Sequence, residues 1–487
     1  MCSIQEDDIE NPIKKDNTKK SKVCMKCGGE AVLITRINDP LCRDCFMVYT
    51  THKFRAAIGK SKIIRDGETV LVGFSGGQAS SCLLQLIKDG LSQRAHKKLR
   101  FKPSLLFIDE GAAIDMSAEE RLDSCQKILQ VMAKSGFPCH IRSLEEAMDS
   151  SFITTNSSKD SLASTDLPDL DLDEQSQGQR SNNDLNTEQP KSADKPKTNG
   201  LPIDKDFKEK CLHYDESEIK LKELLKSLKS VTAKEDLIKS LRYNILIDTA
   251  RKHSHTKVMT GDCSTRLSVR LLSDISQGKG AHVAMETGFA DKRLDDITIV
   301  RPIRDFSSKE VTLYNVLNDV ESVFIPTLTT KAPQNTSIEH LTESFITGLQ
   351  ADYGSTVMNI MRTGEKLTTE ILDSTEQQCI ICHAPLDTST GIASALNAVE
   401  FSQKISRKKE DETSPECCGE GDGSCNTKSG RLTKEEALST MCYGCRLMVK
   451  DLSDVNKLPE YIQRDITNRV NRSKMKADIQ DYLLADD

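Results

Sequence analysis

Two sets of paired cysteines are the residues of this chain best suited to chemistry. The first set is Cys24, Cys27, Cys42 and Cys45, and the second set is Cys379, Cys382, Cys442 and Cys445. Two C-x-x-C pairs supply the four thiolates of a tetrahedral zinc site, and such closed sites are normally structural. The long segment between the pairs of the second set permits closure, because the entropic cost grows slowly with length. We therefore expect two structural zinc sites, with unrelated thiols as the alternative. We expect His383 to be a surface neighbour of the second site, with a role as ligand in place of one cysteine as the alternative.

The remaining cysteines are expected to be thiols rather than disulfides. The chain has 17 cysteines in all, and in a reducing compartment so many are metal ligands or core thiols rather than disulfides. Cys417, Cys418 and Cys425 lie in a polar, glycine-rich stretch. We expect these three to be bystander thiols, and a role as ligands or redox-active groups is the alternative.

A glycine-rich turn is the second candidate for chemistry. It follows an apolar strand at 68–74, precedes a helix at 80–87, and contains Ser75, Gly76, Gly77, Ser80 and Ser81. Backbone N–H groups exposed at a helix N-terminus favour a phosphate, so these residues are candidates for nucleotide binding. A turn that only redirects the chain is the alternative. The turn lacks the Gly-Lys-Ser/Thr of a Walker loop and the G-x-G-x-x-G fingerprint.

Strands and helices alternate around this turn. Apolar runs predict strands at 68–74, 104–108, 138–141, 256–260 and 296–300, and periodic patterns predict intervening helices at 80–87, 117–134, 217–228, 235–252, 265–275 and 307–317. Ser117 and Glu120 form a capping-box pair at the start of one helix. Strand–helix–strand repetition implies a parallel sheet with right-handed crossovers. We predict an α/β fold with a parallel-sheet core.

Composition sets limits on function and organisation. The 487 residues carry a formal net charge of −7, which excludes an overall basic nucleic-acid binder but leaves room for a local basic face. No apolar run reaches the roughly 18 residues of a membrane span, and 1–20 lacks a signal-peptide core, so we expect a soluble intracellular protein. The expected segments are a disordered 1–20, a zinc knuckle at 21–60, the α/β domain at 61–149 and 207–330 around a disordered insertion at 150–206, a helical 331–375, a zinc module at 376–450 with a disordered 401–431, and a tail at 451–487.

Three segments together resemble a known family. Ser75-Gly76-Gly77-Gln78-Ala79-Ser80 resembles the Ser-Gly-Gly-x-Asp-Ser loop of the PP-loop ATP pyrophosphatases, and 260–263 resembles their Thr-Gly-His-Asn segment. The segment 300–306 resembles the Arg-Pro-Leu segment of the tRNA 2-thiolation branch, whose members also carry cysteine pairs at both ends. In this combination the chain resembles the cytoplasmic tRNA 2-thiolation protein 2 family over about 20–450, insertions excluded.

The resemblance implies a function in tRNA modification. That family is associated with converting the wobble uridine of cytosolic tRNAs for Lys, Glu and Gln to its 2-thio form. Its members are thought to pair with an active homologue, cytoplasmic tRNA 2-thiolation protein 1. Sulfur arrives from a thiocarboxylated ubiquitin-related modifier.

The departures from the family pattern concern catalysis. The loop Asp is replaced by Ala79, the Asn by Cys263, and the acidic pair that follows by Thr265 and Arg266, so the carboxylates that suit magnesium are missing. The two cysteines of active thiolases are also absent, one from 234–240 and one from the stretch between Cys263 and Cys379. We hypothesise a non-catalytic, pseudoenzyme subunit. The alternatives are an active sulfurtransferase with Cys263 as its thiol and a zinc scaffold without a nucleotide role, and whether ATP binds is left open.

Basic residues provide candidate RNA contacts. Arg301 and Arg304 follow a strand at the carboxyl edge of the expected sheet, where ligands bind in open parallel sheets. Arg266 and Arg270 lie on one face of a helix, and other basic clusters occur at 53–62, 96–100 and 251–255. Phosphate contacts from such residues would suit a tRNA partner. Salt bridges and a solvated surface are the alternative.

Overall fold

The computed structural model describes residues 23–35, 39–92, 98–150, 152, 216–280, 283–333, 335–367, 378–386, 432–452 and 454–479. The chain divides into a first unit of 1–107, 230–235 and 250–375 and a second unit of 108–229, 236–249 and 376–487. Nearly all of the expected insertion at 150–206, all of 401–431, and with it Cys417, Cys418 and Cys425, lie outside the described residues. None of the described helices has both the length and the apolar character that crossing a bilayer requires.

A mixed, mainly parallel sheet confirms the predicted α/β fold. Its strand order is β5-β4-β3-β6-β8-β7, where β3 pairs with β4 and β6 in parallel, β6 pairs with β8 in parallel, and β7 pairs antiparallel with β8. The strands are β3 (Thr69–Gly73), β4 (Lys102–Asp109), β5 (Cys139–Ser143), β6 (Lys257–Met259), β7 (Ala290–Asp291) and β8 (Thr298–Val300). Each of the five expected strands is present, and β7 is an additional edge strand.

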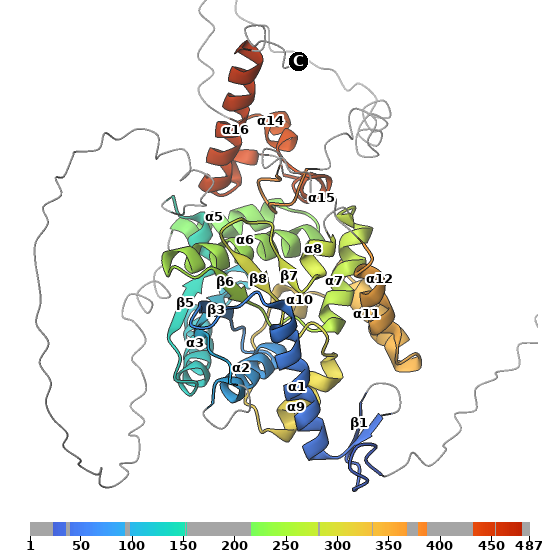
Figure 1. Ribbon diagram of the computed structural model, residues 1–487. Coiled ribbons are helices and arrows are strands. Elements are labelled where there is room, and N and C mark those ends of the chain that lie inside the picture. Colours follow the sequence, from blue (N-terminus) through green and yellow to red (C-terminus); the bar gives the residue numbers. More distant parts are fainter. Residues whose placement is uncertain are drawn as a thin grey trace, which may run out of the picture. The chain divides into compact units, whose positions relative to one another are not determined.

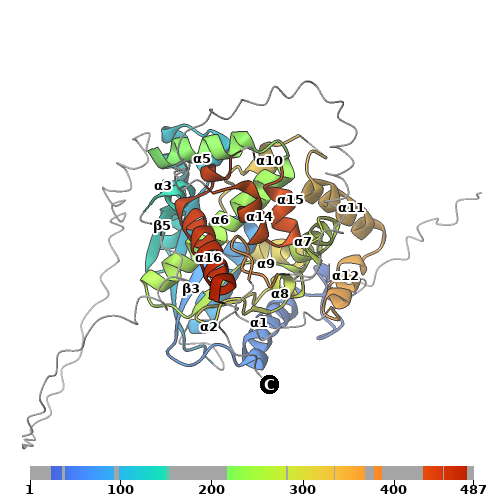
Figure 2. The same ribbon diagram turned by 90° about the horizontal axis from the view of Figure 1, so that it is seen from above.

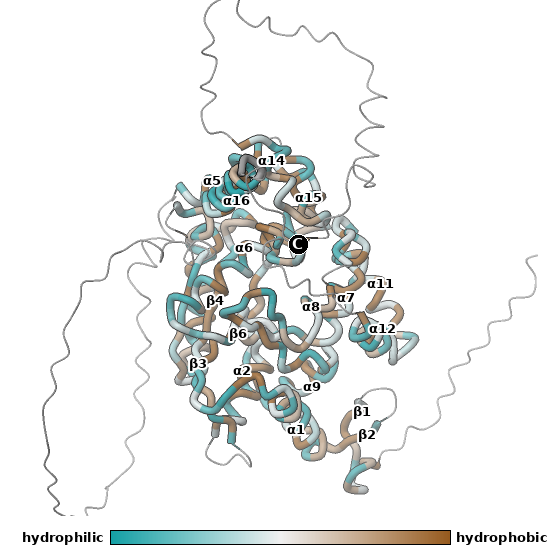
Figure 3. The backbone as a smooth tube through the Cα atoms, turned by 45° about the horizontal axis from the view of Figure 1, so that its top comes forward, coloured by the Kyte–Doolittle hydropathy of each residue, from teal (hydrophilic) through white to brown (hydrophobic). Residues whose placement is uncertain are grey.

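The centre of the sheet is fully buried. Val70, Leu71 and Val72 of β3 have no exposed surface, as expected for a strand covered on both faces, where the apolar run is continuous. Apolar residues also fill one side of the neighbouring α2 (Gln78–Leu91), as Figure 3 shows. This packing fixes the turn between β3 and α2 at the carboxyl edge of the sheet.

Helices and a small hairpin complete the first unit. The hairpin consists of β1 (Leu33–Thr35) and β2 (Asp39–Leu41), which pair antiparallel. The helices are α1 (Arg43–Ser61), α7 (Ser264–Ser276), α8 (Val283–Thr287), α9 (Ser308–Leu317), α10 (Leu328–Lys331), α11 (Ile338–Asp352) and α12 (Thr356–Gly364), with both ends of α6 (Val231–Lys252). The helical segment expected after residue 331 is thus present as α11 and α12.

Helix α1 was not among the predicted elements. Its polar and apolar residues are spread around the helix rather than gathered on one side, so the pattern of a surface helix is weak. It contacts α2 and α9, and Figure 1 shows it running beside α9. Lys53 Nζ lies 3.0 Å from Glu310 Oε2 and 4.7 Å from the centre of the Phe306 ring. Tertiary contacts of this kind therefore place the helix that follows the first cysteine set.

The second unit contains the rest of the helices. They are η1 (Gly111–Ile114), α3 (Ala118–Ala133), η2 (Leu144–Met148), α5 (Glu216–Ser227), the middle of α6, α14 (Lys434–Ser439), α15 (Tyr443–Met448), η6 (Val455–Lys457) and α16 (Glu460–Ile479). The capping box of Ser117 and Glu120 is confirmed at the start of α3. In Figure 2, α16 lies over α6, and Asn244 Nδ2 donates to the Tyr461 hydroxyl at 2.8 Å.

Candidate functional site

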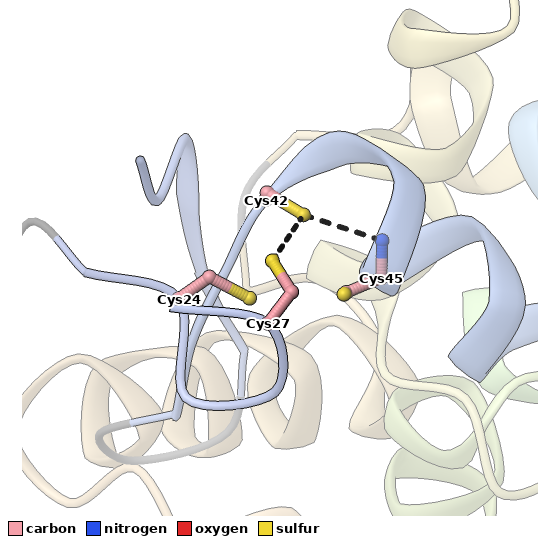
Figure 4. A group of neighbouring side chains, drawn as sticks. All are labelled: Cys24, Cys27, Cys42 and Cys45. Atoms are coloured by element: carbon pink, nitrogen blue, oxygen red, sulfur yellow. Dashed lines mark hydrogen bonds between the residues drawn. The ribbon is translucent and has the colours of Figure 1, made fainter. Parts of the chain in front are cut away.

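The first cysteine set forms one compact group, shown in Figure 4. The Sγ atoms of Cys24, Cys27, Cys42 and Cys45 all lie within 4.8 Å of one another. Cys24 and Cys27 lie in a knuckle whose turn requires Gly28 at a φ of +74°, in the left-handed region that glycine tolerates. Cys42 and Cys45 lie at the start of α1, where Cys45 N donates to Cys42 Sγ at 3.4 Å. The local fold therefore brings both pairs to one point.

The geometry of this group suits a tetrahedral metal. Zinc–sulfur bonds of about 2.3 Å place neighbouring sulfurs of a tetrahedron about 3.8 Å apart. Cys27 Sγ and Cys42 Sγ are 3.6 Å apart, far beyond the roughly 2.05 Å of a disulfide. Burial raises the pKa of the Cys24 thiol, but backbone N–H groups of Cys27 and Cys42 outweigh burial and lower that pKa to about 6. The neighbouring Cys42 thiol, followed by burial, raises the pKa of Cys45 to about 12, so four thiolates need a cation between them.

The second cysteine set repeats the same design in the second unit. Its four Sγ atoms also lie within 4.8 Å of one another, and Cys382 Sγ is 3.7 Å from Cys442 Sγ. One pair lies in a knuckle closed by a bridge between Gln378 and Pro385, and the other begins α15. Cys379, Cys442 and Cys445 are buried. Both predicted cysteine groups could therefore hold a metal ion, and the second is the more enclosed.

His383 corrects an expectation. It was expected to be a surface residue, yet only 5% of its surface is exposed. Its φ of +56° gives it the knuckle position that Gly28 holds in the first set. Its Nε2 lies 3.2 Å from Asn244 Oδ1, so this histidine joins the knuckle to α6.

The glycine-rich turn lies where the sequence predicts, between β3 and α2. Ser80 Oγ donates to the Gly77 carbonyl at 2.9 Å, Ser81 Oγ donates to the Gly76 carbonyl at 3.2 Å, and the Ser75 and Ser80 hydroxyls are 3.2 Å apart. The hydroxyls of Ser80 and Ser81 are therefore bound to the turn itself. A Cβ atom on Gly261 would come within 3.0 Å of the Ser80 backbone, so the turn after β6 packs directly against the start of α2.

Cys263 lies in that neighbouring turn, at the N-cap of α7. Its side chain is 5% exposed, and its Sγ is 3.5 Å from the Ser308 hydroxyl. Burial, followed by the nearness of Cys263 and Glu310, raises the pKa of Cys82. The structure thus places Cys263 beside the glycine-rich turn, as predicted, but in a closed environment.

Arg301 is held by acidic side chains and carbonyls of its own unit. It is 3% exposed, its Nε lies 3.6 Å from Asp262 Oδ2, and its Nη2 lies 3.6 Å from Asp291 Oδ2. Its Nη1 also donates to the Gly288 carbonyl at 3.0 Å. Asp262 was not singled out from the sequence. The only signal for it was its place between Gly261 and Cys263 in a family-like segment.

Arg304 and Arg266 differ in their surroundings. Arg304 is 8% exposed and pairs with Glu365 at 2.7 Å and with Asp305 at 3.6 Å. Arg266 is exposed on the first turn of α7. In the structure Arg301 and Arg304 therefore form salt bridges, which was the alternative to a role in RNA binding. Arg266 faces solvent. Contact of any of the three with RNA stays a prediction.

We expect Asp262→Asn to lower the free energy of unfolding by about 2 kcal/mol at pH 7. Burial raises the pKa of Asp262, but the charges of Arg270 and Arg301 outweigh it and lower the pKa from 3.8 to about 2, and each unit corresponds to about 1.4 kcal/mol. A lowered carboxyl pKa stabilises the folded state above about pH 3.8, the usual pKa of an aspartate. That stabilisation is lost as the pH falls through about 2. Urea unfolding followed by circular dichroism should show the gap between variant and wild type closing over that range.

The matched control for this prediction is Asp305→Asn. Asp305 is 55% exposed and meets Arg304 at 3.6 Å, so its replacement should change the free energy of unfolding by less than about 1 kcal/mol. The difference in free energy of unfolding between wild type and Asp262→Asn should depend on pH. If it stays constant from neutral to acidic pH, Asp262 does not stabilise the fold through its charge.

The fold and these groups define a class. The chain is an α/β protein with a glycine-rich turn at the carboxyl edge of its sheet and a four-cysteine centre in each unit, able to hold a metal. The family model for cytoplasmic tRNA 2-thiolation protein 2 matches 337–447. The chain is 39% identical over 97% of its length to cytoplasmic tRNA 2-thiolation protein 2-A of Xenopus laevis, covering 96% of that protein. The corresponding Homo sapiens protein is 34% identical, over 100% of this chain and 98% of that protein.

The chain therefore belongs to the cytoplasmic tRNA 2-thiolation protein 2 family, and the resemblance drawn from the motifs is confirmed. Among solved structures, the chain is similar to the U34-tRNA thiolase NcsA from Methanococcus maripaludis with its 4Fe-4S cluster. The identity is 13% and the TM-score 0.45, over 72% of this chain and 90% of that one.

Proposed function

We propose that this chain is a non-catalytic subunit of a complex that 2-thiolates the wobble uridine of cytosolic tRNAs for Lys, Glu and Gln. Its partner would be the active homologue, cytoplasmic tRNA 2-thiolation protein 1, which adenylates the uridine. Sulfur would come from a thiocarboxylated ubiquitin-related modifier. In this proposal the subunit acts in the cytoplasm, stabilises the partner and enlarges the surface that binds tRNA.

One observation carries the non-catalytic role: the glycine-rich turn has no magnesium-binding carboxylate where the family loop has one. Ala79 occupies that position, Cys263 stands in the adjoining turn as the N-cap of α7, and Thr265 lies in the first turn of that helix. Asp262 is close by, but its Oδ2 forms an ion pair with Arg301, 3.6 Å from Arg301 Nε. Magnesium on a nucleotide is held by carboxylates and phosphate oxygens, so this turn lacks the groups that adenylation needs.

Cys263 is poorly suited to carry sulfur. A relay thiol has to be reached by its donor and acceptor and must ionise readily. Cys263 is 5% exposed and lies beside a neutral hydroxyl, that of Ser308, at 3.5 Å. The surroundings of this thiol therefore support a structural role, and the chemistry is assigned to the partner.

The two four-cysteine groups would hold zinc. Thiolate ligands suit this borderline-soft ion, and the sulfur separations of 3.6 and 3.7 Å agree with its tetrahedral bond length. All four positions of each group are filled by protein, which leaves no open coordination site. In the proposed function both ions are therefore structural, holding the start of α1 and of α15 in place.

We expect the purified chain to release no pyrophosphate from ATP above the blank when tRNA is added. The catalytic partner alone should release some, and the two chains together should release more. A colorimetric pyrophosphate assay with substrate tRNA compares the three samples. Release by the chain alone would overturn the proposal and make the chain an active sulfurtransferase. Absence of any stimulation of the partner would remove the supporting role.

A further inference from the structure

A short strap, residues 321–326, crosses the glycine-rich turn. It follows α9, whose C-cap Asn318 is followed by a left-handed residue, Asp319, at a φ of +50°. Val320 N donates back to the Asn315 carbonyl at 2.9 Å. A left-handed residue just after a helix stops it and reverses the chain direction. The strap therefore leaves α9 in a fixed direction.

Hydrogen bonds donated by Val323, Gln78 and Asn315 tie the strap and the end of α9 to the turn. Val323 N donates to the Gly76 carbonyl at 2.9 Å, and Gln78 Nε2 donates to the Ser322 hydroxyl at 2.8 Å. Asn315 Nδ2 in turn donates to the Gln78 carbonyl at 2.8 Å. Gln78 occupies the variable position of the family-like loop, where any residue type fits the pattern. These contacts hold the strap at the carboxyl end of β3.

The strap presents an exposed aromatic ring. Phe324 is 78% exposed, the highest fraction among the large apolar side chains that the structure describes as exposed. Its Cα lies one peptide, about 3.8 Å, from that of Val323, whose N–H is bound to Gly76. The ring is thus carried by an anchored backbone at the edge of the sheet where ligands of open parallel sheets bind.

The charges around the strap favour one kind of partner. Helix α1, which packs beside α9, carries Arg43, Arg55 and Lys60 in addition to Lys53, which is already paired with Glu310 at 3.0 Å, and its one acid is Asp44. The Arg43 guanidinium donates to the carbonyl of Leu317 at the end of α9. A basic helix attracts phosphates. The strap begins with Glu321, and Asp319 lies just before it, so two acidic residues near the ring disfavour a phosphate there. An uncharged nucleobase flanked by phosphates matches this arrangement.

We propose that Phe324 is a base-stacking residue for an unpaired nucleotide of an RNA loop. The inference rests on the proposed function, since it requires that the chain itself binds RNA. Unstacked bases in RNA loops are commonly held against aromatic rings, and every base has a face that can stack. The glycine-rich turn then serves as the anchor of an RNA contact.

The first test uses tryptophan fluorescence in the full chain. The natural sequence contains no tryptophan, so Phe324→Trp introduces a single reporter. Titration with a short RNA hairpin that has a single-stranded loop should quench this emission, and a blunt RNA duplex with the same number of phosphates should not. The matched control is Phe345→Trp on α11, where Phe345 is 57% exposed. Equal quenching of both reporters, or of neither, would overturn the proposal.

The second test measures affinity for the same two RNAs by fluorescence anisotropy. Phe324→Ala should weaken hairpin binding by about tenfold and leave duplex binding unchanged, Phe324→Tyr should retain hairpin binding, and Phe345→Ala should have no effect. A wild-type chain that binds neither RNA would overturn both the RNA-binding role and this inference. Binding of the hairpin that is insensitive to Phe324→Ala would overturn the inference alone and would favour an apolar protein partner for the ring.

Discussion

Replacing Cys445 with serine is expected to release the zinc ion proposed for the second cysteine group and to unfold the module around it. Structural zinc contributes on the order of 10–16 kcal/mol to the folding of small zinc-dependent peptides. That contribution is as large as the whole stability of a typical domain, about 5–15 kcal/mol. Loss of the ion should therefore abolish α14 and α15 as ordered helices.

The enclosed setting of this group explains why the effect should be large. When the four sulfurs are brought together without an ion, the Cys379 thiol raises the pKa of Cys445 well above its usual value. The Cys382 and Cys442 thiols, and then burial, act in the same direction. The knuckle also supports α6, because Ser240 Oγ donates to the Ile381 carbonyl at 2.9 Å and His383 contacts Asn244. Unfolding of the knuckle would leave these α6 side chains without partners.

The measurement is metal content per chain by mass spectrometry, together with hydrogen exchange of the amides of α15 and α16. We expect Cys445→Ser to hold one ion per chain in place of two, and the amides of α15 to lose their protection from hydrogen exchange. Cys139→Ser is the matched control, since Cys139 is a half-buried thiol outside both groups whose Sγ contacts the Phe137 carbonyl at 3.1 Å. Two ions and unchanged protection in Cys445→Ser would show that Cys445 is not required to hold either the ion or the module.

The parts of the fold that were predictable have local signals. A short apolar run such as Val70, Leu71 and Val72, bounded by turn residues, is typical of a buried strand, and paired C-x-x-C spacings are typical of a four-cysteine metal group. The capping box of Ser117 and Glu120 is similarly local. Each of these features depends on residues a few positions apart.

The features that could not be predicted depend on contacts between distant residues. Helix α1 is positioned by Lys53 and Glu310, which are 257 residues apart. The hydrogen bond between Gln78 and Ser322 joins residues 244 positions apart. His383 was expected at the surface because a histidine beside a metal knuckle often is, and its partner Asn244 is 139 residues away. Side-chain partners of this kind leave no periodic or spacing pattern in a single sequence.

Arg121 is the strongest example, and its replacement by methionine is expected to lower the free energy of unfolding by about 3–5 kcal/mol. The guanidinium is 2% exposed and touches three carboxylates, those of Asp109 at 2.6 Å, Glu218 at 3.1 Å and Glu145. Removing one partner of a buried ion pair leaves uncompensated charges, which costs several kcal/mol. Here a single cation is shared by the end of β4, η2 and α5, so the three elements lose one common anchor.

The control for this variant lies on the same helix. Lys127→Met removes a cation of α3 whose side chain is 58% exposed and paired with Asp123, and such a pair contributes about 0.3–0.5 kcal/mol. Urea unfolding followed by circular dichroism gives both differences. Equal effects of the two substitutions would mean that the carboxylates around Arg121 are already neutral or solvated.

The pH dependence of Arg121→Met separates lost charge from lost packing. Burial raises the pKa of Glu145 even in the presence of Arg121, which acts in the opposite direction, and Glu145 Oε2 has no hydrogen-bond partner among the described residues. Without the arginine the pKa of this carboxyl should rise further. A raised carboxyl pKa means that the folded state binds a proton at a pH where the unfolded chain does not, so stability is gained as the pH falls toward about 4.5. The deficit of Arg121→Met should therefore shrink between pH 7 and about pH 5, whereas a packing defect would be the same at both.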